Sequence, residues 1–209
     1  LAFLRHDNEA AVQHLLGAIN SNGEDLDARL LLAMTYRDQG KKDDALEQLA
    51  KVSAIDPADR IALAERYFLT GDTEAKSKLR DYMGEQSEDA IEVSIFYSSL
   101  ERWKEAVTVL KMVEPPNNKD PWGTSPVYYY TLAYDLKQSG DLEAAAENRK
   151  KAQAAAGIVE RFPYRRQTVA PLEDAVKENP NDAGARFNLA CLLYFRDHHA
   201  EAIQQWKAV

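Results

Sequence analysis

The sequence predicts an all-α protein built as a series of antiparallel helix pairs, and three observations support this prediction. Apolar residues recur at the i, i+3, i+4 and i+7 spacing of an amphipathic helix in segment after segment. Turn residues such as Gly40 and Gly140 divide these segments into pairs. Alanine recurs at corresponding positions, so that Ala11 precedes Ala45 by 34 residues. A fixed period of this length indicates a repeat protein.

Residues 27–57 contain the most regular pair, with Gly40 between its two helices and Pro57 at its end. Apolar residues line one face of each helix: Leu32, Ala33 and Tyr36 before the turn, and Ala45, Leu49 and Val52 after it. Helices shorter than about 12–15 residues are marginal alone in water. We therefore expect each pair to be stabilised by burial against the neighbouring pairs.

This stretch resembles the tetratricopeptide family. It reads R-x2-L-A-x2-Y…A-x3-L…P, where the family pattern is W-x2-L-G-x2-Y…A-x3-F…P. The departure is Arg29, which stands where the family prefers Trp. The resemblance implies a right-handed superhelical solenoid in which the first helix of each pair lines the concave side. It also implies binding of a protein or peptide, because the family serves many kinds of assembly.

The pattern extends over residues 1–209 as one repeat array. We expect units near 1–23, 26–57, 60–84, 88–118, 126–157 and 183–209, with a half unit at 161–181. The half unit matches only the second helix of a repeat, and its Thr168 precedes Ala202 by 34 residues. Residues 114–126, rich in Pro, Gly and Asn, form an inserted loop. This loop is either solvated, with Trp122 against the array, or a lid over the inner surface.

Residues 161–209 also resemble the repeat region of large bacterial proteins in which a galactose-mutarotase-like β-sandwich domain precedes the repeats. This implies a sugar-related setting for a longer protein. The chain begins on Leu1 and ends on Val209 within an apolar-periodic segment, so we expect it to be a fragment. Its single cysteine, Cys191, excludes an internal disulfide and fits a reducing compartment. The start does not fit a secretory signal and the apolar runs are short, so we expect a cytoplasmic location.

A second apolar stripe runs beside the core stripe of each first helix. It reads Leu30, Met34, Arg37, then Ile91, Ile95, Ser98, then Tyr130, Tyr134, Lys137, then Phe187, Cys191, Tyr194. Such a stripe either packs one first helix against the next or covers a partner. We predict that twelve residues on the concave face bind a partner. They are Leu30, Met34, Arg37, Ile91, Ile95, Tyr130, Tyr134, Lys137, Phe187, Asn188, Cys191 and Tyr194. Tyr130 and Tyr134 are the strongest indication, because tyrosine is enriched at recognition surfaces.

The ligand that fits this stripe is a helical or extended apolar peptide, or another domain of the same polypeptide. Chaperone-binding members of the family hold a terminal carboxylate with paired Lys and Asn residues on the inner face. Here only Arg37, Lys137 and Asn188 are polar and suitable, which argues against such a clamp. A basic cluster forms a separate candidate for anion binding: Arg149, Lys150, Lys151, Arg161, Arg165 and Arg166. The alternative for this cluster is a solvated face or cations near a helix C-terminus.

Composition and motifs argue against several other functions. The formal net charge of −8 disfavours nucleic acid and anionic membranes as partners. No phosphate-binding, dinucleotide-binding, zinc-protease or nucleophile-elbow motif is present, so we expect no enzyme, cofactor or metal. Asp197, His198 and His199 are expected to have structural roles in and after a turn.

Three hypotheses about function follow. The first is a non-catalytic scaffold for protein–protein interaction. The second is an accessory repeat region of a larger carbohydrate-related bacterial protein, in contact with its own β-sandwich domain. The third is self-association into a homo-oligomer through open repeat ends, because terminal repeats expose apolar surface unless they are capped.

Overall fold

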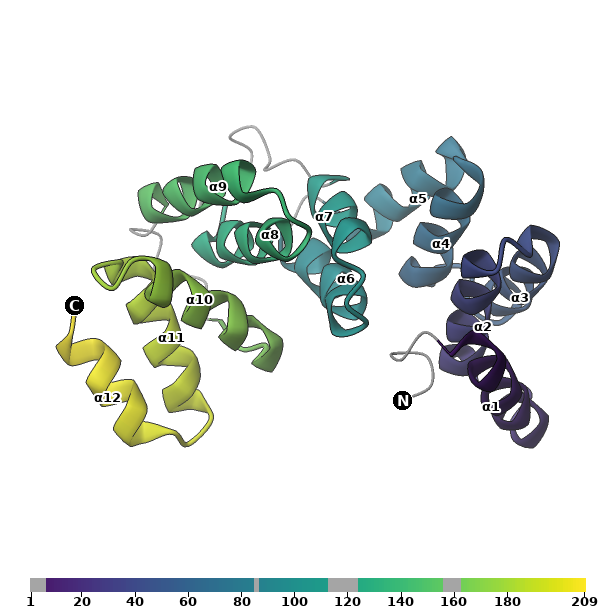
Figure 1. The fold of residues 1–209 in the computed structure, drawn as a ribbon, viewed down its shortest axis with the longest axis horizontal. Helices are drawn as coiled ribbons and strands as arrows, with labels where there is room; N and C mark the ends of the chain where they lie inside the picture. The colour runs from purple at the N-terminus through teal and green to yellow at the C-terminus, as the bar shows by residue number, and fades with distance from the viewer. Residues whose placement is uncertain (1–6, 85–86, 113–123, 156–162) are drawn as a thin grey trace. The chain divides into compact units, whose positions relative to one another are not determined.

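The computed structural model describes residues 7–84, 87–112, 124–155 and 163–209, and these residues contain α-helices and no β-strand. They belong to two compact units, Leu1–Gly84 and Glu85–Val209, which we describe separately. Within each unit, helices that follow one another in the chain lie side by side as antiparallel pairs (Figure 1). The predicted fold class, an all-α array of helix pairs, is confirmed for the described residues.

Residues 7–84 of the first unit contain five helices: α1 (Asn8–Ser21), α2 (Leu26–Asp38), α3 (Lys42–Ile55), α4 (Arg60–Thr70) and α5 (Thr73–Met83). α2 pairs with α3, α4 pairs with α5, and α4 also contacts both α2 and α3. The core between these helices consists of Leu30, Ala33, Leu49, Val52 and Ala62. The pair α2–α3 therefore buries its apolar surface partly against α4, as expected for a repeat array.

The second unit contains seven α-helices and one 3-10 turn in its described part: α6 (Ser87–Ser99), α7 (Trp103–Met112), α8 (Pro126–Gln138), α9 (Leu142–Ala154), η2 (Arg166–Thr168), α10 (Val169–Glu178), α11 (Ala183–Phe195) and α12 (His199–Lys207). The pairs are α6–α7, α8–α9 and α11–α12. α10 packs against α8 and α11. A core cluster joins α8 and α9 to α10 and α11, and its buried members are Tyr130, Ala152, Leu172, Ala175, Ala185, Leu189 and Leu192.

The same linker precedes α2, α4 and α11. First, an Asn or Asp side chain accepts a hydrogen bond from the backbone amide two residues further on; these residues are Asn22, Asp56 and Asn179. Three positions later an aspartate caps the helix by accepting from an amide in its first turn; these residues are Asp25, Asp59 and Asp182. Such caps satisfy amides that have no partner within the helix, and so they fix where each helix begins.

The turn inside a pair contains one residue in the left-handed region. Gly40 has a φ of 71° and Gly140 has a φ of 94°, and this conformation costs glycine no steric strain. Glu101 and Asp197 occupy the corresponding positions in the α6–α7 and α11–α12 turns, with φ values of 58° and 64°. The expected structural role of Asp197 in a turn is confirmed.

Arginine replaces the tryptophan of the repeat pattern by making polar contacts between the two helices of a pair. The Arg29 guanidinium donates to the carbonyl of Gly23 and to Oε1 of Gln48 on α3, the latter at 3.0 Å. Arg186 repeats this arrangement in the last pair, where it donates to the carbonyl of Pro180 and to Oε1 of Gln205. The aliphatic part and the charged head of arginine thus take the place of one large ring.

Two sequence predictions fall mostly outside the described residues. Of the predicted inserted loop 114–126, only the last three residues are described, and Ser125 caps α8 by accepting from the Val127 amide. Trp122 and Arg161 lie outside the described residues. Within the described ranges, none of the helices is both long and apolar enough to cross a membrane.

Candidate functional site

The stripe predicted to form a binding surface on α2 is largely buried. Leu30 has an exposed fraction of 2%, and Met34 is fully buried. Arg37, the third member, forms an ion pair with Glu65 of α4, with 2.9 Å between Nε and Oε2. Glu65 has an exposed fraction of only 1%. This part of the stripe therefore packs α2 against the following first helix, α4.

The stripe on α6 and α8 makes equivalent contacts. Ile91 is buried, and the Ser98 hydroxyl donates to Oδ1 of Asp135 on α8 at 2.9 Å. Lys137, in the last turn of α8, forms ion pairs with Asp174 and Glu178 of α10 at 2.5 and 2.6 Å. In each case the third stripe residue meets a carboxylate from a helix later in the chain.

Tyr130 is a core residue with a polar anchor. Its exposed fraction is 1%, and its hydroxyl donates to Oδ1 of Asp182 at 2.8 Å. Burial and the neighbouring Asp182 carboxylate raise the pKa of Tyr130, so the hydroxyl stays protonated. Asp182 also caps α11 and accepts from the Gln153 amide group, so one buried carboxylate connects α8, α9 and α11.

Six residues of the predicted partner-binding set are therefore corrected to packing residues, because their side chains are buried: Leu30, Met34, Ile91, Tyr130, Asn188 and Cys191. Burial also raises the pKa of the Cys191 thiol. Arg37 and Lys137 are held in ion pairs, and Tyr134 makes an edge contact with Trp103 at 5.9 Å between ring centroids. Partner binding by the partly exposed Ile95 and Tyr134 stays a prediction.

The basic cluster is divided between two places and is partly neutralised. Arg149 of α9 lies 3.8 Å from Asp174, and Lys151 pairs with Glu147 on the same helix. Arg165 forms ion pairs with Glu88 and Glu92 of α6. Only Lys150 and Arg166 are exposed and without such a described pair. Acidic residues of α6 and α10 thus lie against Arg165 and Arg149, and anion binding by Lys150 and Arg166 stays a prediction.

A buried carboxyl group, Asp135, makes the stability of the second unit dependent on pH. Burial raises the pKa of Asp135 from 3.8 to about 7, against the opposing effect of the Ser98 hydrogen bond, and Oδ2 has no hydrogen-bond partner among the described residues. The folded state therefore binds a proton that the unfolded state releases between about pH 4 and pH 7. The stabilisation that the protonated Asp135 carboxyl contributes is therefore present at pH 4, and it is lost as the pH rises from 4 through about 7.

Asp135→Asn is accordingly expected to raise the free energy of unfolding at pH 8 by about 4 kcal/mol and to change it little at pH 4. Urea unfolding of the parent and the variant at both pH values measures the difference, in which the other titrating groups cancel. An equal effect at both pH values would show that the Asp135 carboxyl does not titrate in this range.

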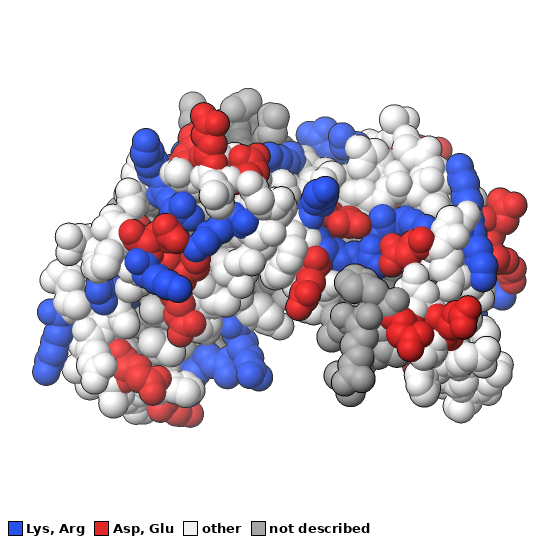
Figure 2. Space-filling model, in the orientation of Figure 1, with Lys and Arg blue, Asp and Glu red and all other residues white. Residues whose placement is uncertain are grey.

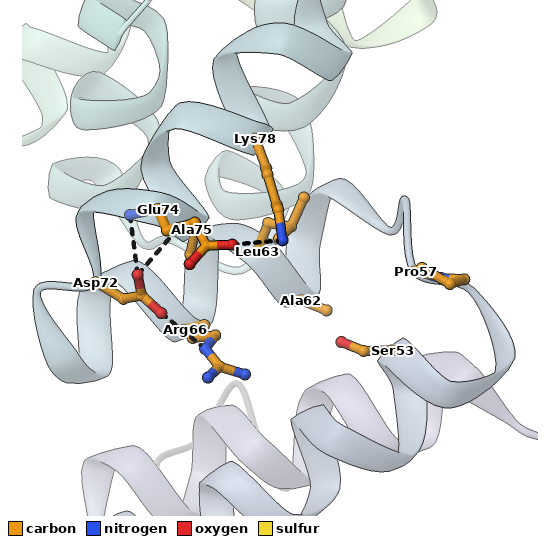
Figure 3. A pocket seen from close by; sticks show the side chains of 9 residues that line it. All are labelled: Ser53, Pro57, Ala62, Leu63, Arg66, Asp72, Glu74, Ala75 and Lys78. Carbon is orange, nitrogen blue, oxygen red and sulfur yellow. Dashed lines mark hydrogen bonds and ion pairs between the residues drawn. The ribbon is translucent and has the colours of Figure 1, made fainter.

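Two surface cavities are candidates for ligand binding. The first, of about 240 Å³, lies among α3, α4 and α5, and Figure 3 shows its lining. Its charged side chains already pair with one another, as Arg66 with Asp72 and Lys78 with Glu74. The second, of about 280 Å³, is lined by Glu92, Ile95, Tyr164, Arg165 and Gln167. Arg165 lies over the Tyr164 ring there and pairs with Glu92, so neither cavity presents a free charged group for a ligand.

The exposed face of the last pair is different, because it is aromatic and apolar. Phe187 and Tyr194 of α11 have exposed fractions of 37% and 50%, and Ile203 of α12 has 44%. The Tyr194 ring contacts the Trp206 ring of α12 at 5.5 Å between centroids. We call these four residues the α11–α12 face. Phe187 and Tyr194 belong to the predicted partner-binding set and are accessible in the structure.

Ile203 and Trp206 are not among the site residues that the sequence predicts. The signal that identifies them is the helical spacing of i, i+3 on α12 together with the stripe on α11. Basic and acidic side chains intermingle over much of the face in view in Figure 2.

Among the described residues, no group of three or more His, Cys, Asp or Glu side chains is placed to hold a metal ion. His198 and His199 interact locally instead. His198 Nδ1 lies 2.8 Å from Oε2 of Glu201, and the His199 ring lies 4.5 Å from the Tyr194 ring. These contacts stabilise the start of α12 and one edge of the α11–α12 face.

No protein-family model and no curated protein sequence matches the chain. Solved structures with similarity include MamA, at 16% identity over 77% of this chain and 91% of that chain, with a TM-score of 0.35. Pseudomonas aeruginosa PilF shows 19% identity over 90% of this chain and 77% of its own, with a TM-score of 0.32. YrrB, described as a TPR protein with an unusual peptide-binding site, shows 14% identity over 93% and 89%, with a TM-score of 0.30.

These TM-scores are low, so the class assignment rests on the helix pairs themselves. The turns within the pairs have a residue in the left-handed region at corresponding positions, and aspartates cap the helices that follow the linkers. The pairs also share buried alanines at corresponding positions, such as Ala33, Ala45, Ala190 and Ala202. The described helix pairs therefore agree with the tetratricopeptide-like fold that the sequence resemblance implies. The relation of residues 161–209 to proteins with a β-sandwich domain stays a prediction.

Proposed function

We propose that this chain is a non-catalytic scaffold for protein–protein interaction, and that it binds a partner protein through the α11–α12 face. The observation that carries the proposal is the concentration of exposed large apolar side chains on this pair. Exposed clusters of aromatic and aliphatic residues are typical of protein interfaces. Tyrosine and tryptophan are also the residues that most often dominate binding energy.

The proposal moves the binding surface from the concave stripe to the end of the second unit. Most stripe residues of α2, α6 and α8, all except the partly exposed Ile95 and Tyr134, are used for packing, for a hydrogen bond or for ion pairs. On α11 the stripe residues Phe187 and Tyr194 are accessible, and the Trp206 ring of α12 extends the same surface. An open apolar surface of this kind suits a protein partner better than a small molecule, which needs an enclosed pocket.

A double variant tests this function. Tyr194→Asp with Ile203→Asp is expected to reduce capture of a native partner from a lysate of the source organism by at least about tenfold, because two charges must be buried on binding. The circular dichroism spectrum should stay unchanged, since both side chains are about half exposed. Affinity capture followed by mass spectrometry measures the loss.

Tyr82→Asp is the matched control, because Tyr82 of α5 has a similar exposed fraction of 49% but lies in the other unit. This control is expected to retain the same partner. If the double variant keeps the partner at the level of the control, the α11–α12 face is not the binding surface.

A further inference from the structure

We propose that the contact between the α6–α7 pair and α8 is a proton-controlled joint, which stays closed while the Asp135 carboxyl is protonated and opens when that carboxyl is ionised. The joint lies within the second unit and is independent of binding at the α11–α12 face. Three observations carry the proposal: the position of Asp135 between helix pairs, the surroundings of its two oxygens, and the contacts that hold each end of the α6–α7 pair.

Asp135 brings an ionisable side chain to a position where the corresponding residues of two other pairs are uncharged. Its exposed fraction is 1%, and Oδ1 accepts a hydrogen bond from the Ser98 hydroxyl of α6 at 2.9 Å. Thr35 of α2 and Leu192 of α11 hold the same position, and both are fully buried. The Thr35 hydroxyl donates to the Leu31 carbonyl of its own helix, so it needs no partner across the boundary between pairs. Asp135 is thus the member of this set whose charge depends on pH.

The surroundings of Asp135 suit a protonated carboxyl better than an ionised one. Oδ2 has no hydrogen-bond partner among the described residues, and Oδ1 is bonded to a neutral hydroxyl. A buried carboxylate needs a cation or several donors to offset its lost hydration, whereas a protonated carboxyl loses much less on burial. Ionisation therefore favours a rearrangement that lets water reach Asp135.

The ion pairs that the surrounding helices form leave this carboxyl out. These pairs are Lys137 with Asp174 and Glu178, Arg149 with Asp174, Arg102 with Glu105, and Arg165 with Glu88 and Glu92. The neighbouring titratable group that responds to the charge of Asp135 is Tyr134. Its pKa is raised, first by burial and then by the charges of Asp174 and Asp135. Tyr134 therefore stays neutral wherever Asp135 titrates.

One end of the α6–α7 pair is fixed by contacts that do not involve Asp135. At the start of α6, Glu88 pairs with Arg165, and near the end of α7 the Leu110 carbonyl accepts from the Tyr128 hydroxyl of α8 at 2.9 Å. These two places lie at the same end, because α6 and α7 are antiparallel. α8 itself also packs against α9, α10 and α11, so it is held in the rest of the unit.

The opposite end, where α6 turns into α7, depends on Asp135. Here the pair meets α8 through the hydrogen bond from Ser98 to Asp135 and through the Trp103 ring, which lies 5.9 Å from the Tyr134 ring between centroids. Ionisation of Asp135 therefore loosens this end, and the fixed end acts as the hinge.

The direction of the pH dependence follows from linkage. Burial raises the pKa of Asp135 from 3.8 to about 7, against the opposing effect of the Ser98 hydrogen bond. In the open joint, water reaches the carboxyl, and its pKa returns toward its ordinary value. Opening thus releases a proton between about pH 4 and pH 7. The equilibrium constant for opening rises by up to about tenfold per pH unit over this range and levels off above it.

Hydrogen–deuterium exchange of the full chain tests the joint, measured by mass spectrometry from pH 5 to pH 8 and corrected for intrinsic exchange rates. We expect the protection of amides in residues 96–106 to fall at least about tenfold between pH 5 and pH 7. At pH 8 their protection should be at least about tenfold lower than that of α8, because α8 keeps its contacts with α9, α10 and α11.

Asp135→Asn removes the titrating group and keeps the shape of the side chain. In this variant, the protection of residues 96–106 should change by less than about twofold between pH 5 and pH 7. Glu101→Gln is the matched control, because it neutralises an exposed carboxylate in the turn between α6 and α7. This control should keep the pH profile of the parent.

Two results on the parent chain would overturn the proposal. Equal protection of residues 96–106 and of α8 at every pH would show that the unit unfolds as a whole, without a joint. Faster exchange of residues 96–106 with a protection that does not vary with pH would show that their opening does not expose Asp135. A pH-dependent fall that persists in Asp135→Asn would assign the effect to another group and would equally overturn the proposal.

Discussion

Replacing Tyr130 with alanine is expected to lower the free energy of unfolding of the second unit by about 3 to 5 kcal/mol. The substitution removes a fully buried ring from the cluster that joins α8 and α9 to α10 and α11. It also removes the hydroxyl that donates to Asp182. Asp182 caps α11, so loss of this contact weakens the start of the helix as well as the core.

Urea unfolding followed by circular dichroism measures this effect. Tyr194→Ala is the matched control, because Tyr194 lies at the corresponding face of α11 but is half exposed, and it should cost less than about 1 kcal/mol. Tyr130→Phe isolates the hydroxyl and should cost about 1 to 3 kcal/mol. Equal costs for Tyr130→Ala and Tyr194→Ala would show that Tyr130 is not a packing residue.

Replacing Arg37 with methionine is expected to lower the free energy of unfolding of the first unit by about 3 to 5 kcal/mol. Glu65 is almost completely buried and would lose its ion pair with Arg37, which weakens the contact between α2 and α4. The Phe68 ring, whose centroid lies 5.7 Å from the Arg37 guanidinium carbon, cannot replace that charge.

The double variant Arg37→Met with Glu65→Met should recover most of this loss, because two apolar side chains can replace a buried ion pair. Lys51→Met is the control: its pair with Glu47 is exposed on α3 and should contribute less than about 0.5 kcal/mol. A cost for Arg37→Met as small as that for Lys51→Met would contradict the account of α2 and α4 as packed neighbours.

The helix pairs could be predicted from sequence because their signals are local. Apolar periodicity, the glycine turns at Gly40 and Gly140 and the aspartate caps depend on residues within one or two turns of helix. The position of Arg29 was recognised as a departure from the family pattern. Its two hydrogen-bond partners were not foreseen, because Gln48 lies on the other helix of the pair.

The function of the second stripe could not be decided from sequence, because packing between repeats and partner binding need the same apolar spacing. The distinction depends on whether another helix covers the stripe. Arg37 and Glu65 are 28 residues apart, and Lys137 and Asp174 are 37 apart, so no local pattern connects them. The basic cluster was misread for the same reason, since Arg165 is neutralised by Glu88 at a separation of 77 residues.

A useful sequence signal does exist at the third stripe position. Where a helix covers the pair, this position holds Arg37, Ser98 or Lys137, and a carboxylate follows later in the chain. In the last pair the position holds Tyr194, and the aromatic residue Phe187 precedes it on the same helical face. Among the described pairs, the one with an aromatic residue at this position is the one whose face is exposed.

The most direct test of this account compares the accessibility of two equivalent stripe positions. In a Cys191→Ala background, Leu30→Cys and Phe187→Cys chains are treated with a thiol reagent under native conditions, and the labelling rates are measured by mass spectrometry. The account predicts that Cys at 187 reacts at least about tenfold faster than Cys at 30, because only buried thiols need local opening to react. Equal rates at the two positions would contradict the claim that the α11–α12 face is the uncovered copy of a packed surface.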